Sequence, residues 1–178
     1  EHFTSFGKNT VLVTNRIARI NVHGQYIPYN TVYGNNVINI NDKSISKYEW
    51  IFELVNPDRK YDDLYPICIG LDSSNNKYVD GLFCYSKFNN NKCRKYGCWS
   101  NGYLDGYEHV NPIIEERSFV DEWKDGDIIC MMLDVKKKKL KYSVNGVKYI
   151  NIKIDLKNQE YNLAVALSPA HQNTIEII

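Results

Sequence analysis

The chain has 178 residues, of which 43% are hydrophobic and 24% charged, and a formal net charge of +1. This length suits one domain with one core, and the composition excludes a disordered, collagen-like or coiled-coil chain. The small net charge supplies no long-range field that would recruit nucleic acid or an anionic membrane surface. Because the first residue is Glu1 rather than methionine, we expect residues 1–178 to form a single domain of a larger protein.

In the first half of the chain, short runs rich in β-branched and aromatic residues alternate with stretches rich in Asn, Asp and Gly. Such runs predict strands, and the stretches between them, such as Asp72–Asn76, predict turns. The expected strands are Thr10–Thr14, Ala18–Val22, Asn36–Ile40, Tyr48–Val55, Pro66–Leu71 and Gly81–Tyr85.

A central strand and a hairpin are the clearest features of the second half. Ile128–Leu133 is apolar on both alternating faces, which predicts a strand covered on both sides. Asn145-Gly146 then separates Leu140–Val144 from Val147–Ile154, and this dipeptide between alternating runs predicts a type I′ hairpin. Tyr161–Leu167 is the last expected strand.

The pattern as a whole predicts an all-β protein. Helical periodicity is confined to one turn at Ser118–Trp123, and many short strands at a spacing of about 8–12 residues favour a sandwich or barrel. Trp50 and Trp123 flank apolar runs, so we expect both in the core. We interpret the run Lys136–Lys139 as the solvated tip of a hairpin, because the chain is otherwise nearly neutral.

Residues that could support metal binding or catalysis form no recognisable motif. The four histidines lack helical ligand spacing, and Cys93 and Cys98 lack a second pair of ligands. Asp72–Asp80 lacks the closing Glu of a calcium loop, and there is no Gly-x-Ser-x-Gly or glycine-rich phosphate loop. We therefore expect a protein that is not an enzyme and binds no metal or other cofactor.

Cysteine usage and hydropathy bear on where the protein acts. The five cysteines are an odd number, and Cys68 and Cys130 lie in apolar runs as small core residues would. We therefore expect reduced thiols and an intracellular, cytoplasmic setting. The longest apolar run has six residues, whereas a spanning helix needs about 20, so we expect no membrane insertion.

An ordered series of motifs resembles the SPRY (B30.2-like) domain over nearly the whole chain, from about Asn9 to Ile178. The series is Phe119-x3-Trp123-x-Asp125-Gly126-Asp127-Ile128, Leu133-Asp134, Leu140-x-Tyr142 with Asn145-Gly146, and Tyr161-x2-Ala164-Val165-Ala166-Leu167. Trp50-x-Phe52-x-Leu54, Ile67–Leu71 and Tyr96–Gly102 agree with it. The resemblance implies a bent β-sandwich of two antiparallel sheets, related to the concanavalin-like jelly roll.

The resemblance also implies where a partner binds, since SPRY domains contact partners through variable loops at one end of the sandwich. Peptide-binding members use an early loop, a tyrosine-bearing loop after the Ile-Gly strand and the loop after the Ala-Val strand. The matching residues here are His23, Gln25, Tyr26, Tyr29, Tyr78, Ser168, Pro169, Ala170, His171 and Gln172, and Trp99 is a further candidate. Because the last loop lacks the aromatic residue of the best-known peptide binders and 23–29 lacks arginine, their peptide preference is not carried over.

Two hypotheses of function follow. The first is a non-catalytic protein-interaction module, monomeric as an isolated domain, that binds a peptide or protein surface through the loop end, and the second is a carbohydrate-binding lectin-like domain. In the second, Trp99 would stack on a sugar ring while Asn101 and Asp105 hydrogen-bond its hydroxyls. Neither hypothesis involves nucleic acid, and we favour the protein-interaction module.

Overall fold

The structure is a computed structural model that describes residues 1–6, 10–14, 16–20, 30–55, 67–73, 95–99, 104–107, 113–117, 123–156, 158–167 and 174–178. Its regular elements in these ranges are all strands, which confirms the all-β prediction. They are β1 (Phe3–Phe6), β2 (Thr10–Thr14), β3 (Ile17–Ile20), β4 (Asn30–Asn39), β5 (Lys47–Val55), β6 (Ile67–Asp72), β7 (Lys95–Trp99), β8 (Leu104–Tyr107), β9 (Ile113–Arg117), β10 (Ile128–Asp134), β11 (Lys139–Val144), β12 (Val147–Lys153), β13 (Glu160–Leu167) and β14 (Thr174–Ile177).

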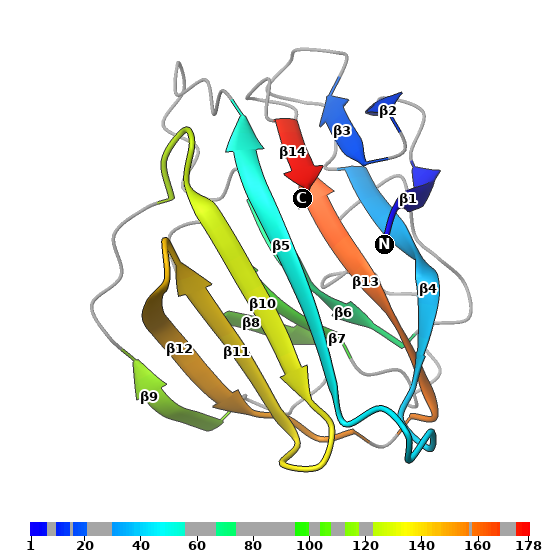
Figure 1. Ribbon diagram of the computed structural model, residues 1–178, viewed down its shortest axis with the longest axis vertical. Coiled ribbons are helices and arrows are strands. Elements are labelled where there is room, and N and C mark those ends of the chain that lie inside the picture. Colours follow the sequence, from blue (N-terminus) through cyan, green and yellow to red (C-terminus); the bar gives the residue numbers. More distant parts are fainter. Residues whose placement is uncertain are drawn as a thin grey trace.

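The strands form two antiparallel sheets. The six-stranded sheet has the order β1-β4-β13-β6-β7-β8, and the eight-stranded sheet has the order β2-β3-β14-β5-β10-β11-β12-β9. Figure 1 views the eight-stranded sheet face on, with β6, β7 and β8 of the other sheet behind it. This is the sandwich of two antiparallel sheets that the SPRY resemblance implies.

The hydrophobic core lies between the two sheets and follows the alternation of each strand. Phe52 and Leu54 of β5, with Leu140 and Tyr142 of β11, point inward and are buried. From the other sheet, Ile69 and Leu163 belong to the same cluster. The hydroxyl of Tyr142 donates to the backbone oxygen of Ile69 at 3.0 Å, which joins the two sheets directly.

The two predicted core tryptophans are confirmed, since Trp50 and Trp123 are 4% and 2% exposed. The indole Nε1 of Trp50 donates to a carboxylate oxygen of Glu1 at 3.0 Å, so its polar atom is satisfied at the edge of the core.

The two sheets differ in how their faces are covered. Every residue of β6 is buried, so both faces of the six-stranded sheet are shielded there. In β10, by contrast, Ile129, Met131 and Leu133 are buried while the residues between them are half-exposed. The prediction that Ile128–Leu133 is covered on both sides is therefore wrong for its outer face, although β10 is central in its sheet.

Cys68 and Cys130 are the two cysteines whose side chains the structure describes, and they differ in the same way. Cys68 is buried as predicted, whereas Cys130 is half-exposed on the outer face of β10, so its prediction as a core residue is wrong. The reason is geometric, because a strand with apolar residues on both faces does not reveal which face is covered.

The predicted hairpin turn of the second half is confirmed, and another turn precedes β10. Asn145 and Gly146 have φ values of 50° and 78°, as a type I′ turn requires, and they join β11 to β12. Gly126 also has a φ of 78°, and its N–H donates to the backbone oxygen of Leu54 at 2.8 Å. The Asp125–Asp127 turn therefore fixes the start of β10 beside β5.

Other boundaries differ from the predictions. β4 begins at Asn30, before the predicted Asn36, and Asp72 is the buried last residue of β6 instead of part of a turn. Asp72 accepts a hydrogen bond of 2.9 Å from the hydroxyl of Tyr33, which explains why this polar side chain is buried. The predicted strand Gly81–Tyr85, and the predicted helical turn apart from Trp123, lie outside the described residues.

Candidate functional site

The outer face of the eight-stranded sheet is the exposed surface that the described residues define best. Residues alternate along β5, so Lys47, Glu49 and Ile51 face outward while Tyr48, Trp50 and Phe52 are more buried. Ile51 is 37% exposed and lies opposite Cys130 of β10. Apolar side chains are therefore accessible in the middle of this face.

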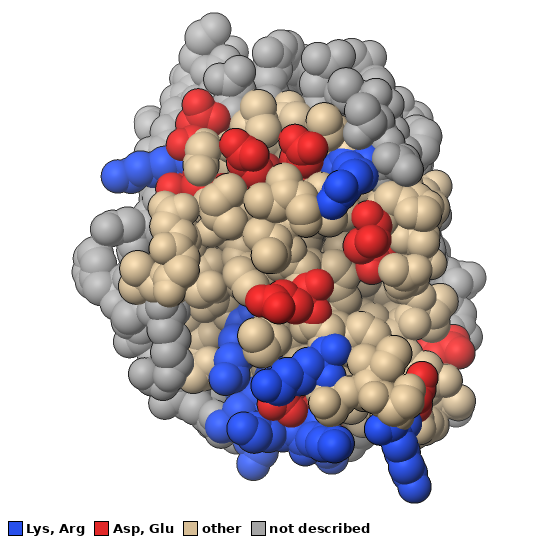
Figure 2. Space-filling model, in the orientation of Figure 1, with Lys and Arg blue, Asp and Glu red and all other residues tan. Residues whose placement is uncertain are grey.

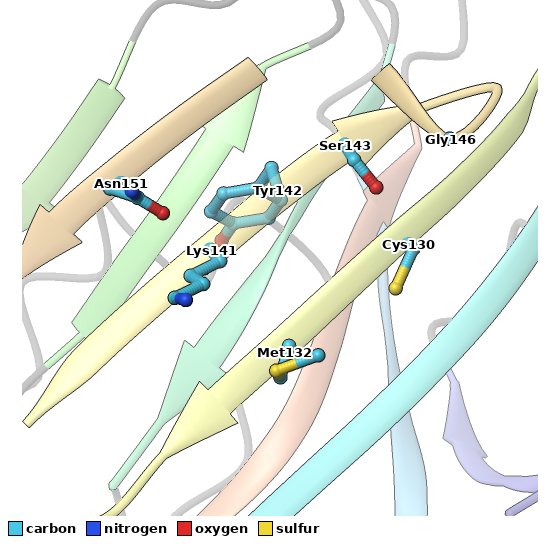
Figure 3. A pocket seen from close by; sticks show the side chains of 7 residues that line it. All are labelled: Cys130, Met132, Lys141, Tyr142, Ser143, Gly146 and Asn151. Carbon is cyan, nitrogen blue, oxygen red and sulfur yellow. The ribbon is translucent and has the colours of Figure 1, made fainter. Parts of the chain in front are cut away.

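A depression of about 190 Å³ lies on this face beside the apolar side chains. Cys130 and Ser143 lie opposite each other on β10 and β11, and both side chains are small. The next outward pair, Met132 and Lys141, is much longer. The depression forms because small side chains meet at one register position, and its lining is Cys130, Met132, Lys141, Tyr142, Ser143, Gly146 and Asn151 (Figure 3).

The thiol of Cys130 is the most reactive type of group in this depression. It donates a hydrogen bond to the Glu49 carboxylate, with 3.1 Å between sulfur and Oε1. Partial burial, and then the hydrogen bond and charge of Glu49, raise the pKa of Cys130 to about 11. The group stays a neutral thiol near pH 7, so the arrangement does not supply a nucleophile.

One end of the outer face carries a lysine patch. Lys136, Lys137 and Lys138 are exposed in the turn between β10 and β11, as the hairpin-tip prediction states. The register brings further lysines to the same end, since Lys139 lies opposite Lys153 and Asp134 lies opposite Lys47. We define the patch as Lys47, Lys136, Lys137, Lys138, Lys139, Lys141 and Lys153, and Figure 2 shows most of the blue surface there.

A buried carboxylate shapes the turn that presents these lysines. Asp134 is 4% exposed, and its Oδ1 accepts a hydrogen bond of 2.9 Å from the backbone N–H of Lys137. The backbone of Lys138 has a φ of 52° and closes the turn. The lysine side chains are therefore displayed on a turn of defined shape.

The other end of the face carries carboxylates. Glu53 of β5 lies directly opposite Glu176 of β14, and the turn with Asp125 and Asp127 adjoins β5 through Leu54. Figure 2 shows red side chains mainly over this half of the face. The face is thus electrically polarised: most of its lysines lie at one end, apolar side chains lie beside Glu49 in the middle, and carboxylates predominate at the other end.

The loop residues predicted from the resemblance lie outside the described residues, with one exception. His23, Gln25, Tyr26 and Tyr29 precede β4, Tyr78 follows β6, and the segment Ser168–Gln172 lies between β13 and β14. Trp99 is the last residue of β7, opposite Cys68, and nothing of its side chain is described. The predicted site therefore stays a prediction.

The strand register nevertheless places the ends of these segments. Asn30, which follows residues 21–29, lies opposite Leu167, which precedes residues 168–173. Asp72 and Lys95, the strand residues nearest the segment that contains Tyr78, lie opposite each other at the other end of the sheet. Segments 21–29 and 168–173 therefore adjoin one end of the sandwich. The segment that contains Tyr78 starts from the opposite end of the strands.

Two of the three residues of the lectin hypothesis, Trp99 and Asp105, are described only by their backbones. Trp99 and Asp105 lie on the neighbouring strands β7 and β8, where Asp105 is opposite Gly97. Asn101 lies outside the described residues.

Within the described ranges, His, Cys, Asp and Glu side chains do not gather into any group of three or more that could hold a metal ion. The same ranges contain no helix of the length and apolar character needed to cross a membrane.

Sequence reasoning missed the polarised face because its central strand is apolar on both sides. The signal that could have revealed it is the pair of small residues, Cys130 and Ser143, next to the lysine run. Their alignment depends on the register of β10 against β11. That register follows from the number of residues in the turn between the two strands, which the sequence alone does not define.

Comparison with known proteins assigns the fold to a class. Neither the family models nor the curated proteins give a match. The solved structures do: the chain has the SPRY fold, a bent sandwich of two antiparallel sheets related to the lectin jelly roll.

Three of these solved structures illustrate the likeness. The SPRY domain of human HERC1 is 14% identical, with a TM-score of 0.61, covering 96% of this chain and 92% of that one. The NHR domain of Drosophila melanogaster neuralized is 10% identical, with a TM-score of 0.60 and coverages of 99% and 96%. Basic winged bean lectin, solved with Tn-antigen, is 10% identical, with a TM-score of 0.62 and coverages of 96% and 87%.

Proposed function

We propose that this chain is a non-catalytic protein-interaction module of the SPRY type, which binds a peptide or protein surface through loops at one end of the sandwich. The observation that carries the proposal is the match to SPRY and NHR domains over nearly the whole chain. Partner binding through the loop end is what the resemblance to SPRY domains implies for such a fold.

The strand register supports part of this loop-end site. Residues 21–29 and 168–173 are adjacent to Asn30 and Leu167, which are paired in neighbouring strands. These two segments contain Tyr26 and His171, an aromatic and an amphipathic side chain of the kind that anchors peptides. The register gives no comparable support to Tyr78, because its segment leaves β6 and enters β7 at the opposite end of the sandwich.

The test is affinity capture from the source cells, followed by titration of each captured protein in purified form. We expect Tyr26→Ala/His171→Ala to lose partners that wild type binds. Asn41→Ala is the matched control, because Asn41 is exposed between β4 and β5 at the other end of the sandwich. Equal recovery by wild type and the double variant, with both folded, would show that the loop end is not the binding site.

A second candidate function, carbohydrate binding, is favoured by one specific observation. The lectin from winged bean matches this fold as closely as the SPRY domain of HERC1 does. Trp99 and Asp105 lie on neighbouring strands, as a sugar site built from them would need. Saturable binding on a glycan array that disappears in Trp99→Ala would support this function, and silence across the array would exclude it for the glycans displayed.

A further inference from the structure

We propose that the lysine patch and the adjoining depression form a second binding surface, which takes an extended acidic segment of a partner protein. In this arrangement carboxylates of the segment pair with the lysines, and one apolar side chain fills the depression. The surface lies on the outer face of the eight-stranded sheet, and the proposal does not depend on the loop-end site.

The distance between the lysine patch and the depression determines how far apart the carboxylate and the apolar residue of the ligand must be. Lys139 and Ser143 are four residues apart on β11, which corresponds to about 13 Å along a strand. An extended segment has the same rise per residue and points alternate side chains in one direction. Its apolar residue must therefore lie four positions from a carboxylate, so that both side chains face the sheet.

The depression suits one apolar side chain. Its volume is about 190 Å³, and it is open to solvent on the outer face. Met132 offers a polarisable thioether, and Cys130 offers a neutral thiol because its pKa is raised to about 11. Transfer of an aliphatic side chain from water into such a site is favourable.

Charge on the same face favours a protein segment over a long polyanion. The patch is limited to one end of the face, and Glu53 and Glu176 lie opposite each other at the other end. A bilayer surface or a nucleic acid strand that covered the face would meet these carboxylates, and neither would use the apolar depression. A short segment that combines carboxylates with an apolar side chain matches both parts.

The direct test is a titration with a synthetic peptide. The probe is acetyl-Asp-Glu-Asp-Gly-Ser-Ser-Leu-Gly-Lys-amide, labelled with fluorescein on its lysine, in which leucine follows the last aspartate by four positions. We expect saturable binding in fluorescence anisotropy that weakens as salt is raised. Replacing the peptide's leucine with alanine should weaken binding about tenfold, because the apolar contact is lost.

Protein variants test the two parts of the surface separately. Lys136→Glu/Lys137→Glu should weaken binding by about tenfold, whereas Lys124→Glu should change it by less than about twofold. Lys124 is the control position because it is exposed beyond the opposite end of β10, beside Asp127. Ser143→Met should fill the depression and remove the preference for leucine, and circular dichroism checks that each variant is folded.

Three results would overturn the proposal. The first is no binding of the leucine peptide to wild type at millimolar concentration, and the second is equal binding of the leucine and alanine peptides. The third is tighter binding of labelled oligo-dT or phosphatidylserine vesicles, with the same loss in Lys136→Glu/Lys137→Glu, because it would identify a general polyanion site. The peptide comparison uses wild-type protein, so these outcomes do not depend on whether a variant folds.

Discussion

At the scale of single residues, Asn145 joins the turn between β11 and β12 to the start of β10 through its side chain and backbone. Its Oδ1 accepts from the N–H of Ile128 and its Nδ2 donates to Asp127, both at 2.9 Å. Its φ of 50° lies in the left-handed region that asparagine tolerates better than most residues. The SPRY-like motif residues Asp127 and Asn145 thus support the fold instead of a binding site.

We predict that Asn145→Ala lowers the free energy of unfolding by about 2–3 kcal/mol, because it removes two hydrogen bonds and adds backbone strain. Asn145→Gly relieves the backbone strain, so it should lower the free energy of unfolding by about 1 kcal/mol less than Asn145→Ala does. Urea denaturation followed by tryptophan fluorescence measures both values. A larger loss of unfolding free energy in the glycine variant than in the alanine variant would show that the left-handed backbone of residue 145 is not strained by a side chain.

The thiol of Cys130 gives a prediction of pH dependence. Its pKa is raised from 9.0 to about 11, mainly by burial and then by Glu49, so the thiolate is depleted below that pH. At pH 9 about one thiol in a hundred is ionised, against about half for an unperturbed cysteine, and alkylation should be about fiftyfold slower. Its rate should rise about tenfold per pH unit between pH 8 and 10.

Mass spectrometry of the iodoacetamide-treated protein reports the labelling of Cys130 directly. Glu49→Gln removes the negative charge beside the sulfur and should lower the pKa, which speeds labelling at a fixed pH. Labelling as fast as that of a free cysteine in wild type would contradict the raised pKa.

At the scale of strands, Tyr33 links β4 to β6 across β13. Tyr33 lies opposite Ala164 of β13, and its hydroxyl donates to Asp72 at the end of β6. Both side chains are buried, at 0% and 1% exposure. The small side chain of Ala164 leaves room for the tyrosine ring on this face, so one hydrogen bond ties three strands together.

We predict that Tyr33→Phe lowers the free energy of unfolding by about 1–2 kcal/mol, because the buried carboxylate of Asp72 loses this donor. Asp72→Asn keeps an acceptor for the hydroxyl and should cost less. Thermal unfolding followed by circular dichroism measures both variants, and a Tyr33→Phe protein as stable as wild type would show that the bond contributes nothing net.

Which strands could be predicted from sequence depends on their local patterning. β5 and β11 largely alternate between inward apolar and outward polar residues, with Ile51 as an outward exception, and the boundaries of β5, β11 and β12 were predicted to within about one residue. The first half of β4 was missed because Asn30 and Thr31 are polar. They are buried through pairing with β13, a tertiary effect that a local pattern does not contain.

The candidate site was less predictable than the strands. The lysine turn was expected at a hairpin tip, and that prediction is confirmed. The further lysines beside this turn were not expected. Lys47 and Lys153 join the patch only through the register of β5, β10, β11 and β12. The loop-end residues were chosen by resemblance to other domains, and their grouping is still a prediction.

At the scale of the whole molecule, the two sheets have different roles. The six-stranded sheet is buried on both faces along β6. The eight-stranded sheet leaves one face open, with charges separated along it (Figure 2). A protein with a net charge of +1 can therefore still present a strongly positive region to a partner.

This separation of charge predicts chromatographic behaviour that net charge alone does not. Lys136→Ala/Lys137→Ala and Lys124→Glu each lower the formal charge by two, from +1 to −1. If the patch controls adsorption, the first variant elutes from a sulfopropyl column at lower salt than the second, because neighbouring lysines act together on a charged surface. Salt-gradient elution at pH 7 measures the difference, and wild type should elute last. Coincident elution of the two variants would mean that the lysines act independently, and the patch would then lack the local field that acidic-segment binding requires.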